Sequence, residues 1–337
     1  MKSLSSSSLA DNGGDTMLPW DNTFDPVSYE VFQLFNFVAQ CVVKPLIILA
    51  GIPSNIINTV VFWRQGLTDR MNFCLFCLAL ADLLYLLSLL SVAQIGPFIE
   101  ITDVLLGKEV YYKSLQFGLG IRDEMRTMAG CITLVIAIER CVCVYLPLRA
   151  SSLMRTRTMA ALLASIFIFI QLGFVYSFFH YDIYAKRSNS TNQTLYWVLE
   201  LSTTYKKNYL LFRGFEVCLL TILPPCIFIS MCLATAATIL KLRTAILWRQ
   251  KTSSMGSGHQ VQQMALMKML VFVSCIYIVT SIPYVALIMT SAFILDFDLG
   301  GRYQNSFLTM GVEEEGSPQG EFPTDSLALT PQVCCLV

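Results

Sequence analysis

The sequence predicts an all-α membrane protein, built as a polytopic bundle of six transmembrane helices. Of its 337 residues 55% are hydrophobic and only 14% are charged, and the mean hydropathy is +0.60. A soluble domain of this length could not hide so much apolar surface, which makes a bilayer the natural solvent. A helix crosses the bilayer core, about 30 Å thick, with about 20 apolar residues. Six stretches meet this length, at about residues 36–63, 72–95, 113–146, 158–180, 212–241 and 264–294.

The charges between these stretches indicate the orientation. The connections at 64–71, 147–157 and 242–263 hold many basic residues and a single carboxylate, Asp69. The basic residues are Arg64, Arg70, Arg149, Arg155, Arg157, Arg243, Arg249 and Lys251. Cytoplasmic loops carry such an excess, whereas the opposite loops here are mixed in sign. We therefore expect residues 1–35 to form an extracellular N-terminal tail.

Two N-glycosylation sequons support this orientation. Asn189 and Asn192 each begin one, and both fall in the loop 181–211 that the charges place outside. A single sequon is weak because the pattern is common by chance, but the agreement supports this topology and predicts a multi-pass glycoprotein.

Several classes of function are disfavoured. The 23 basic and 23 acidic residues balance, so nothing in the total charge indicates a nucleic-acid partner. The only histidines, His180 and His259, lie in or beside loops, where a histidine is usually just solvated. No metal-ligand or nucleophile spacing surrounds them, and we expect no enzyme, no metal and no cofactor.

Polar residues at bilayer depth require an explanation, because an unpaired ionisable group there costs several kcal/mol. Asp82 lies in the middle of the second span and Asn55 in the middle of the first. One interpretation is an interhelical hydrogen bond that orders the bundle, and the other is an ion or proton site. The residues alone favour the hydrogen bond.

Two further groups of charges lie in the third span. Glu139 and Arg140 form either an interfacial anchor or a functional pair, and the span stays apolar for six residues beyond them. Arg122 and Arg126 share a helix face near the outer end, where two cations repel unless an anion lies near them. They suit an anionic ligand. The alternative is an Asp123–Arg126 ion pair with Arg122 extended to the interface, and it is slightly favoured.

In order and spacing, these motifs resemble the rhodopsin-like (class A) G-protein-coupled receptors, over residues 36–308. The matching motifs are Gly51 to Asn55, Asn72, Leu78 to Asp82, Glu139 to Cys141, Tyr145 to Leu148, Pro224 with Pro225, and Pro283.

The resemblance implies a ligand pocket that opens outward between helices 3, 5, 6 and 7, and a cytoplasmic face that opens for a heterotrimeric G protein. It assigns coupling and activation to Glu139, Arg140, Cys141 and Pro283. In that picture Glu139 restrains Arg140 at rest, and Arg140 reaches the G protein when helix 6 swings out. Asn55 and Asp82 would form the polar core of the bundle.

The departures from the family narrow the expectation. The position that usually forms a disulfide with the second outer loop is Leu115, and residues 181–211 contain no cysteine, so we expect no such bridge. Arg122 stands where amine receptors place an aspartate, which disfavours a biogenic amine. The chain is most similar to divergent invertebrate chemosensory-type receptors, with peptide receptors second. The ligand would be an anionic small molecule or a peptide.

The expected seventh helix is missing. After residues 301–308, where it should begin, the chain reads Glu313-Glu314-Glu315 and then contains three prolines. We expect a chain truncated before helix 7, with residues 309–337 a disordered tail outside the family, and signalling impaired relative to a full-length form. A six-helix transporter or channel subunit is the alternative, although we find neither a re-entrant segment nor an internal repeat.

Overall fold

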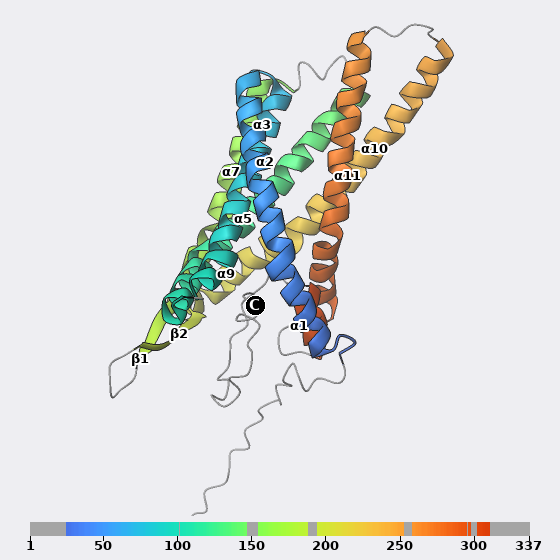
Figure 1. The fold of residues 1–337 in the computed structure, drawn as a ribbon. Helices are drawn as coiled ribbons and strands as arrows, with labels where there is room; N and C mark the ends of the chain where they lie inside the picture. The colour runs from blue at the N-terminus through green and yellow to red at the C-terminus, as the bar shows by residue number, and fades with distance from the viewer. Residues whose placement is uncertain are drawn as a thin grey trace, which may run out of the picture.

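A computed structural model describes residues 25–100, 102–146, 154–187, 194–252, 258–294, 296–297 and 302–310. In this part of the chain, six helices are long and apolar enough to cross a membrane. They are Tyr29–Gln65, Arg70–Leu90, Val104–Tyr145, Thr156–Phe179, Tyr209–Thr244 and Val271–Phe293. The prediction of an all-α bundle with six spans is confirmed, and Figure 1 shows the helices side by side in one bundle.

Several spans combine more than one helical type. The first consists of α1 (Tyr29–Val38), η1 (Ala39–Val43) and α2 (Lys44–Gln65), and the second begins with α3 (Arg70–Leu90), followed by η2 (Ser91–Ile95) and α4 (Gly96–Glu100). The third is α5 (Val104–Tyr145), and the fourth is α7 (Thr156–Phe174) with η3 (Val175–Phe179). After α8 (Thr203–Lys207) come α9 (Tyr209–Glu216), η4 (Val217–Ile222), α10 (Leu223–Thr252), α11 (Gly258–Phe293) and α12 (Gln304–Met310).

The π-helical turns η1 and η4 have an identifiable cause. A proline has no N–H to donate, and its ring clashes with the carbonyl four residues earlier. For Pro45 that carbonyl belongs to Cys41, inside η1, and for Pro224 it belongs to Leu220, inside η4. Widening the turn to a π-helix moves the carbonyl away from the ring. The two prolines therefore bend the first and fifth spans without ending them.

Helix α5 is the axis of the bundle, because it packs against α3, α4, α7, α10 and α11. Ile132 and Ile136 on α5 join Met159 and Phe174 of the fourth span in the buried core. The helix begins at Val104, earlier than the expected residue 113, because Asp103 caps it. The Asp103 carboxylate accepts hydrogen bonds from the N–H groups of Leu105 and Leu106, each at 3.0 Å.

The loop 181–211 contains a β-hairpin that the sequence analysis did not predict. Strand β1 (Tyr181–Arg187) pairs antiparallel with β2 (Thr194–Leu201), and the register changes between Lys186 and Arg187. The Gln116 side chain of α5 donates a hydrogen bond to the carbonyl of Tyr181 at 2.8 Å. This bond fixes the hairpin to α5 beside the buried Leu115. The sequons of Asn189 and Asn192 begin outside the described residues.

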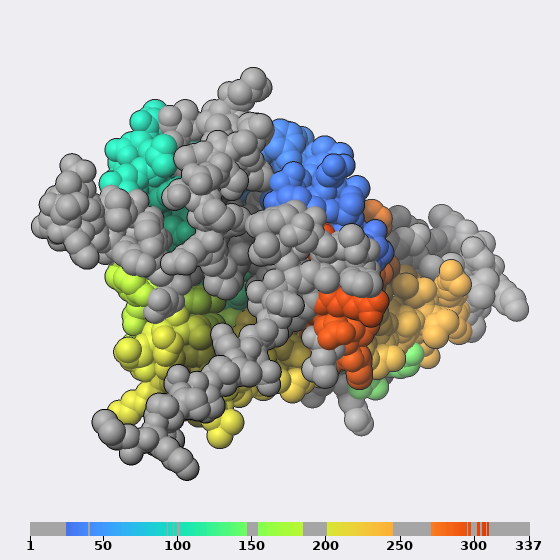
Figure 2. All heavy atoms as spheres, turned by 90° about the horizontal axis from the view of Figure 1, so that it is seen from below, coloured from blue at the N-terminus to red at the C-terminus, as the bar shows by residue number. Residues whose placement is uncertain are grey.

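The short helix α12 packs against α1. Figure 2 shows the blue start and the orange-red end of the described chain on the same face of the molecule. The Asp25 carboxylate accepts hydrogen bonds from the Ser306 N–H, at 3.0 Å, and from the Ser306 hydroxyl. The Asn305 amide donates to the carbonyl of Val27 at 3.2 Å. The expected tail therefore begins with two helical residues, Thr309 and Met310, and residues 311–337 lie outside the described part.

Close helix packing at Gly96 makes a stability prediction. A Cβ atom at Gly96 would lie 2.7 Å from the Tyr111 Cα atom, so the backbones of α4 and α5 would have to separate. Gly96→Ala should cost about 2 kcal/mol and lower the Tm of the purified chain by about 5 °C. Gly214→Ala is the matched control, because nothing lies within 4 Å of its Cβ position. Equal Tm values for the two variants would contradict this packing.

Candidate functional site

Glu139 is buried near the C-terminal end of α5 between two arginines. None of its side chain is exposed. One carboxylate oxygen, Oε2, pairs with the Nε and Nη2 atoms of the neighbouring Arg140. The other, Oε1, lies 2.9 Å from the Nε atom of Arg70. A buried carboxylate is stable only when it is paired and hydrogen-bonded, and here each oxygen has its own guanidinium.

Arg70 is a member of this site that sequence reasoning missed. It is the first residue of α3, and the sequence analysis counted it only among the positive loop charges. Its Nη1 atom donates to the carbonyl of Met154 at 3.0 Å, and its Nη2 atom to the Cys143 sulfur at 3.3 Å. The Cys143 thiol in turn donates to Glu139 Oε1 at 3.3 Å. No local signal links Arg70 to Glu139, because the contact depends on how α3 packs against α5.

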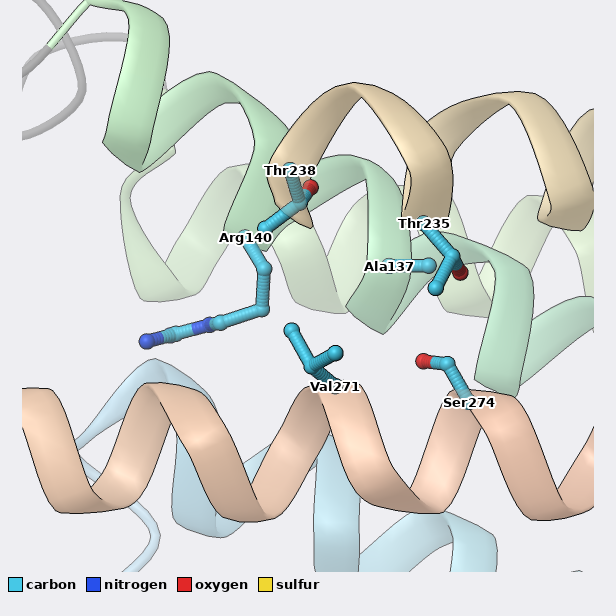
Figure 3. Close-up of a pocket in the computed structure, with 6 residues that line it drawn as sticks. All are labelled: Ala137, Arg140, Thr235, Thr238, Val271 and Ser274. Carbon is cyan, nitrogen blue, oxygen red and sulfur yellow. The ribbon is translucent and has the colours of Figure 1, made fainter. Parts of the chain in front are cut away.

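Arg140 also lines a small cavity where α5, α10 and α11 meet. The lining residues are Ala137, Arg140, Thr235, Thr238, Val271 and Ser274. The cavity measures about 10 Å³, roughly the space for one water molecule. Figure 3 shows Thr235 and Ser274 pointing toward one another across it, while the Arg140 guanidinium extends away. The Thr235 hydroxyl is buried without a hydrogen-bond partner within the described residues.

Cys141 and Pro283, the other two residues assigned to activation, do not interact with the Glu139–Arg140 pair through their side chains in the described part of the chain. Cys141 is half-buried and makes no side-chain hydrogen bond in the described part of the chain. Pro283 lies inside α11, twelve residues beyond Val271, or about 18 Å along the helix axis. Of the four residues assigned to activation, Glu139 and Arg140 are the two whose side chains form an ion pair in the described part of the chain.

Asn55 and Asp82 are not joined by a hydrogen bond. The Asn55 amide donates to the carbonyl of Gly51 in its own helix, at 3.1 Å. Asp82 is half-buried on α3, and its carboxylate makes no hydrogen bond or ion pair within the ranges that the structure describes. The interhelical bond between these two residues, which the sequence favoured, is therefore absent from the described part of the bundle.

The middle of α5 carries a cluster of charges around Asp123. The Oδ1 atom of Asp123 accepts hydrogen bonds from Arg122 at 3.2 Å and from Arg126 at 3.3 Å. Arg126 also donates to the Tyr284 hydroxyl at 2.8 Å, and its Cζ atom lies 4.0 Å from the centre of that ring. The Asp123–Arg126 pair agrees with the favoured interpretation. Arg122 differs from it, because its side chain is only 6% exposed and does not extend to the interface.

Glu124 does not belong to this cluster. It is buried, and its Oε1 atom has no hydrogen-bond partner among the described residues. Two residues along a helix correspond to a rotation of about 200°, so Glu124 faces nearly opposite to Arg122. Counting Arg122, Arg126 and Asp123 alone, two cations share one carboxylate and a single positive charge is in excess.

His180 has a packing role that the sequence analysis did not predict. Its ring is stacked between those of Tyr181 and Tyr205, with centroid distances of 4.2 and 4.3 Å. The Tyr205 hydroxyl donates to Glu216 Oε2 at 3.0 Å. Burial, together with the negative charge of Glu216, raises the pKa of Tyr205. The expectation of a merely solvated loop histidine was wrong, because these rings join the hairpin to the fifth span.

The membrane spans and the buried acid–base pair at one end of α5 define a helical membrane protein of the receptor type. Comparison with known families gives a match to "7 transmembrane receptor (rhodopsin family)" over residues 53–310, which is more than half of the chain. The chain therefore belongs to the rhodopsin family of seven-transmembrane, G-protein-coupled receptors. The match extends through α12. A search among curated proteins found no match to the chain.

The contact between Arg126 and Tyr284 makes a graded stability prediction. Tyr284→Phe keeps the ring under the guanidinium but removes the hydroxyl, so it should cost about 1 kcal/mol. Tyr284→Leu removes both and should cost about 1 kcal/mol more. Thermal unfolding of the purified variants should rank them in this order below the unaltered chain. If the two substitutions lower the Tm equally, the stacked ring contributes nothing.

Proposed function

We propose that this protein is a plasma-membrane receptor that senses an extracellular ligand and transmits the signal to a heterotrimeric G protein through Arg140. The observation that carries the proposal is the position of Arg140. It is buried where α5, α10 and α11 meet, and it is paired with Glu139. The Arg140 guanidinium can bind another protein only after α5, α10 and α11 move apart.

The movement that would expose Arg140 is a displacement of α11. Val271 and Ser274 of α11 line the cavity beside Arg140, so α11 forms one wall of that cavity. Moving α11 outward would open that side to a G protein. Outside-to-inside signalling then requires that ligand binding stabilise the displaced position of α11 relative to the resting one.

We propose further that the chain as written signals poorly. Residues 309–337 contain the run Glu313 to Glu315 and three prolines, a composition that does not form a membrane helix. A seventh helix would close the bundle and could supply a polar partner for Asp82. In residues 1–337 taken by themselves, the half-buried Asp82 carboxylate would remain under-satisfied, which lowers stability and favours retention by quality control.

Adding a seventh helix tests both proposals. The 337-residue chain and a form with a family seventh helix grafted after residue 308 should differ in surface level and in ligand-independent G-protein activation, the grafted form being higher in both. In the grafted form, Arg140→Ala should reduce ligand-stimulated activation at least tenfold, whereas Arg64→Ala, the control at the end of α2, should not. Equal surface level and activation for the two forms would show that six helices suffice.

The proposed ligand is anionic. Arg122 and Arg126 are two cations that share one oxygen of Asp123, and the positive charge of these three side chains exceeds their negative charge by one, which favours an anionic ligand. A carboxylate could replace or supplement Asp123 as their partner, and Tyr284 would link it to α11. A chemosensory-type small acid fits this chemistry best. A peptide with an acidic residue or a free C-terminus would present the same group.

The ligand proposal predicts a selective loss of response. In the grafted form, small carboxylic acids should activate the receptor, and their amides should not. Arg122→Gln should raise the half-maximal concentration at least tenfold, which corresponds to the loss of one charged hydrogen bond. Arg213→Gln, an exposed arginine on α9 that pairs with Glu216, serves as the control. Unchanged potency in Arg122→Gln would remove the proposal.

The proposed orientation places the N-terminus and the loop 181–211 outside. Glycosidase treatment of membranes containing the chain should therefore increase its electrophoretic mobility. The double substitution Asn189→Gln with Asn192→Gln should give the same mobility without treatment. If the variant and the untreated chain migrate together, the two sequons are unused and no longer support the orientation.

A further inference from the structure

We propose that Arg70 is a positioning residue for Arg140, acting through Glu139. The three side chains form a continuous guanidinium–carboxylate–guanidinium bridge from the start of α3 to the end of α5. The connection to G-protein coupling rests on the proposed function above, whereas the bridge itself rests only on the geometry of these residues.

The two arginines bind different oxygens of Glu139. Arg140 occupies Oε2 and Arg70 occupies Oε1, so neither displaces the other. Because Glu139 and Arg140 are consecutive residues of one helix, their pairing by itself does not fix the end of α5 relative to the rest of the bundle. The bond to Arg70 does, because Arg70 belongs to α3.

All three guanidinium nitrogens of Arg70 are engaged. Nε faces Glu139, Nη1 donates to the carbonyl of Met154, and Nη2 donates to the sulfur of Cys143. Met154 lies just before α7, so the one side chain ties the start of the second span to the end of the third and the approach to the fourth. A lysine carries the charge but has a single nitrogen, which could not make these three contacts in the same directions.

The bridge matters because Glu139 has no contact with solvent. A carboxylate at 0% exposure depends on its protein partners for the stabilisation that water would give. Without Arg70, Oε1 would keep only the Cys143 thiol, a weak donor. The carboxylate would then shift or take up a proton, and Arg140 would lose the fixed anion that holds it.

Helix α11 offers no replacement for this restraint. Its residues 258–293 include no aspartate or glutamate, so a direct ion pair between α11 and Arg140 is not available. Within the described residues, Glu139 is the carboxylate that forms an ion pair with Arg140. The position of Glu139 therefore determines the position of Arg140, and Arg70 fixes Glu139 from outside the helix.

Thermal unfolding of the full 337-residue chain, purified in detergent, tests the inference. Arg70→Gln should lower the Tm by about 5 °C, because it leaves a buried charge half-compensated. In a chain that already carries Glu139→Gln, the same substitution should lower the Tm by less than half as much, because it then removes only the bonds to Met154 and Cys143 together with a cation that repels Arg140. If Arg70 acted only through its bond to Met154, the loss would be equal in both chains and the inference would be overturned.

The link to Arg140 is tested by combining Arg70→Gln with Arg140→Gln. With Glu139 present, the Tm of the double variant should fall by more than the sum of the decreases in the two single variants. The reason is that the buried carboxylate then has neither arginine as a partner. With Glu139→Gln added, this excess should fall to less than half. Additive losses in both backgrounds would show that the two arginines are independent.

Arg70→Lys and Arg64→Gln complete the design. The lysine variant should recover part of the loss seen with Arg70→Gln, and only when Glu139 is present. If Arg70→Gln fails to fold, the Tm of Arg70→Lys measured with and without Glu139→Gln decides the question. Arg64→Gln is the matched control, since Arg64 is an exposed arginine at the same end of the bundle. None of these measurements uses a G protein, so failure of the bridge and failure of the coupling proposal are distinguishable.

Discussion

The cost of placing a full charge where water cannot reach it governs the half of the bundle that contains Glu139. Glu139 is fully buried, and a carboxylate in that position must be neutralised by groups that the fold brings to it. The start of α3 and the end of α5 therefore meet around one side chain, and Arg70 links both to Met154, two residues before α7. Apolar packing brings these helices together, and the charge restricts them to arrangements in which both arginines reach it.

The opposite half of the bundle, which carries the β-hairpin, is organised by a different kind of contact. Aromatic stacking of His180 between Tyr181 and Tyr205 joins the hairpin to the fifth span, and a hydrogen bond from Gln116 fixes it to α5. These contacts hold the hairpin at the position where most family members have a disulfide. They are individually weaker than a covalent bond, so the outer loop can reorganise at lower cost.

Helix α5 connects the two halves, because it carries the Asp123 cluster near its middle and the Glu139 cluster near its C-terminal end. It contributes one acid and two arginines to the first cluster and one acid and one arginine to the second. A second helix contributes the partner that gives each cluster its geometry, which is Tyr284 of α11 in the Asp123 cluster and Arg70 of α3 in the Glu139 cluster. A shift of α11 relative to α5 would alter the contact at Tyr284 and the cavity beside Arg140 together.

The sequence alone determined the six spans, and its loop charges predicted their orientation, because apolar length and loop charge are local properties that the bilayer selects directly. It also identified Glu139 and Arg140, since an acid–base pair inside an apolar helix is visible without knowing its neighbours. Only the tertiary structure decided their partners. Arg70 and Tyr284 are far away in the chain, and their contacts depend on helix rotation and tilt, which side-chain packing sets and hydropathy does not encode.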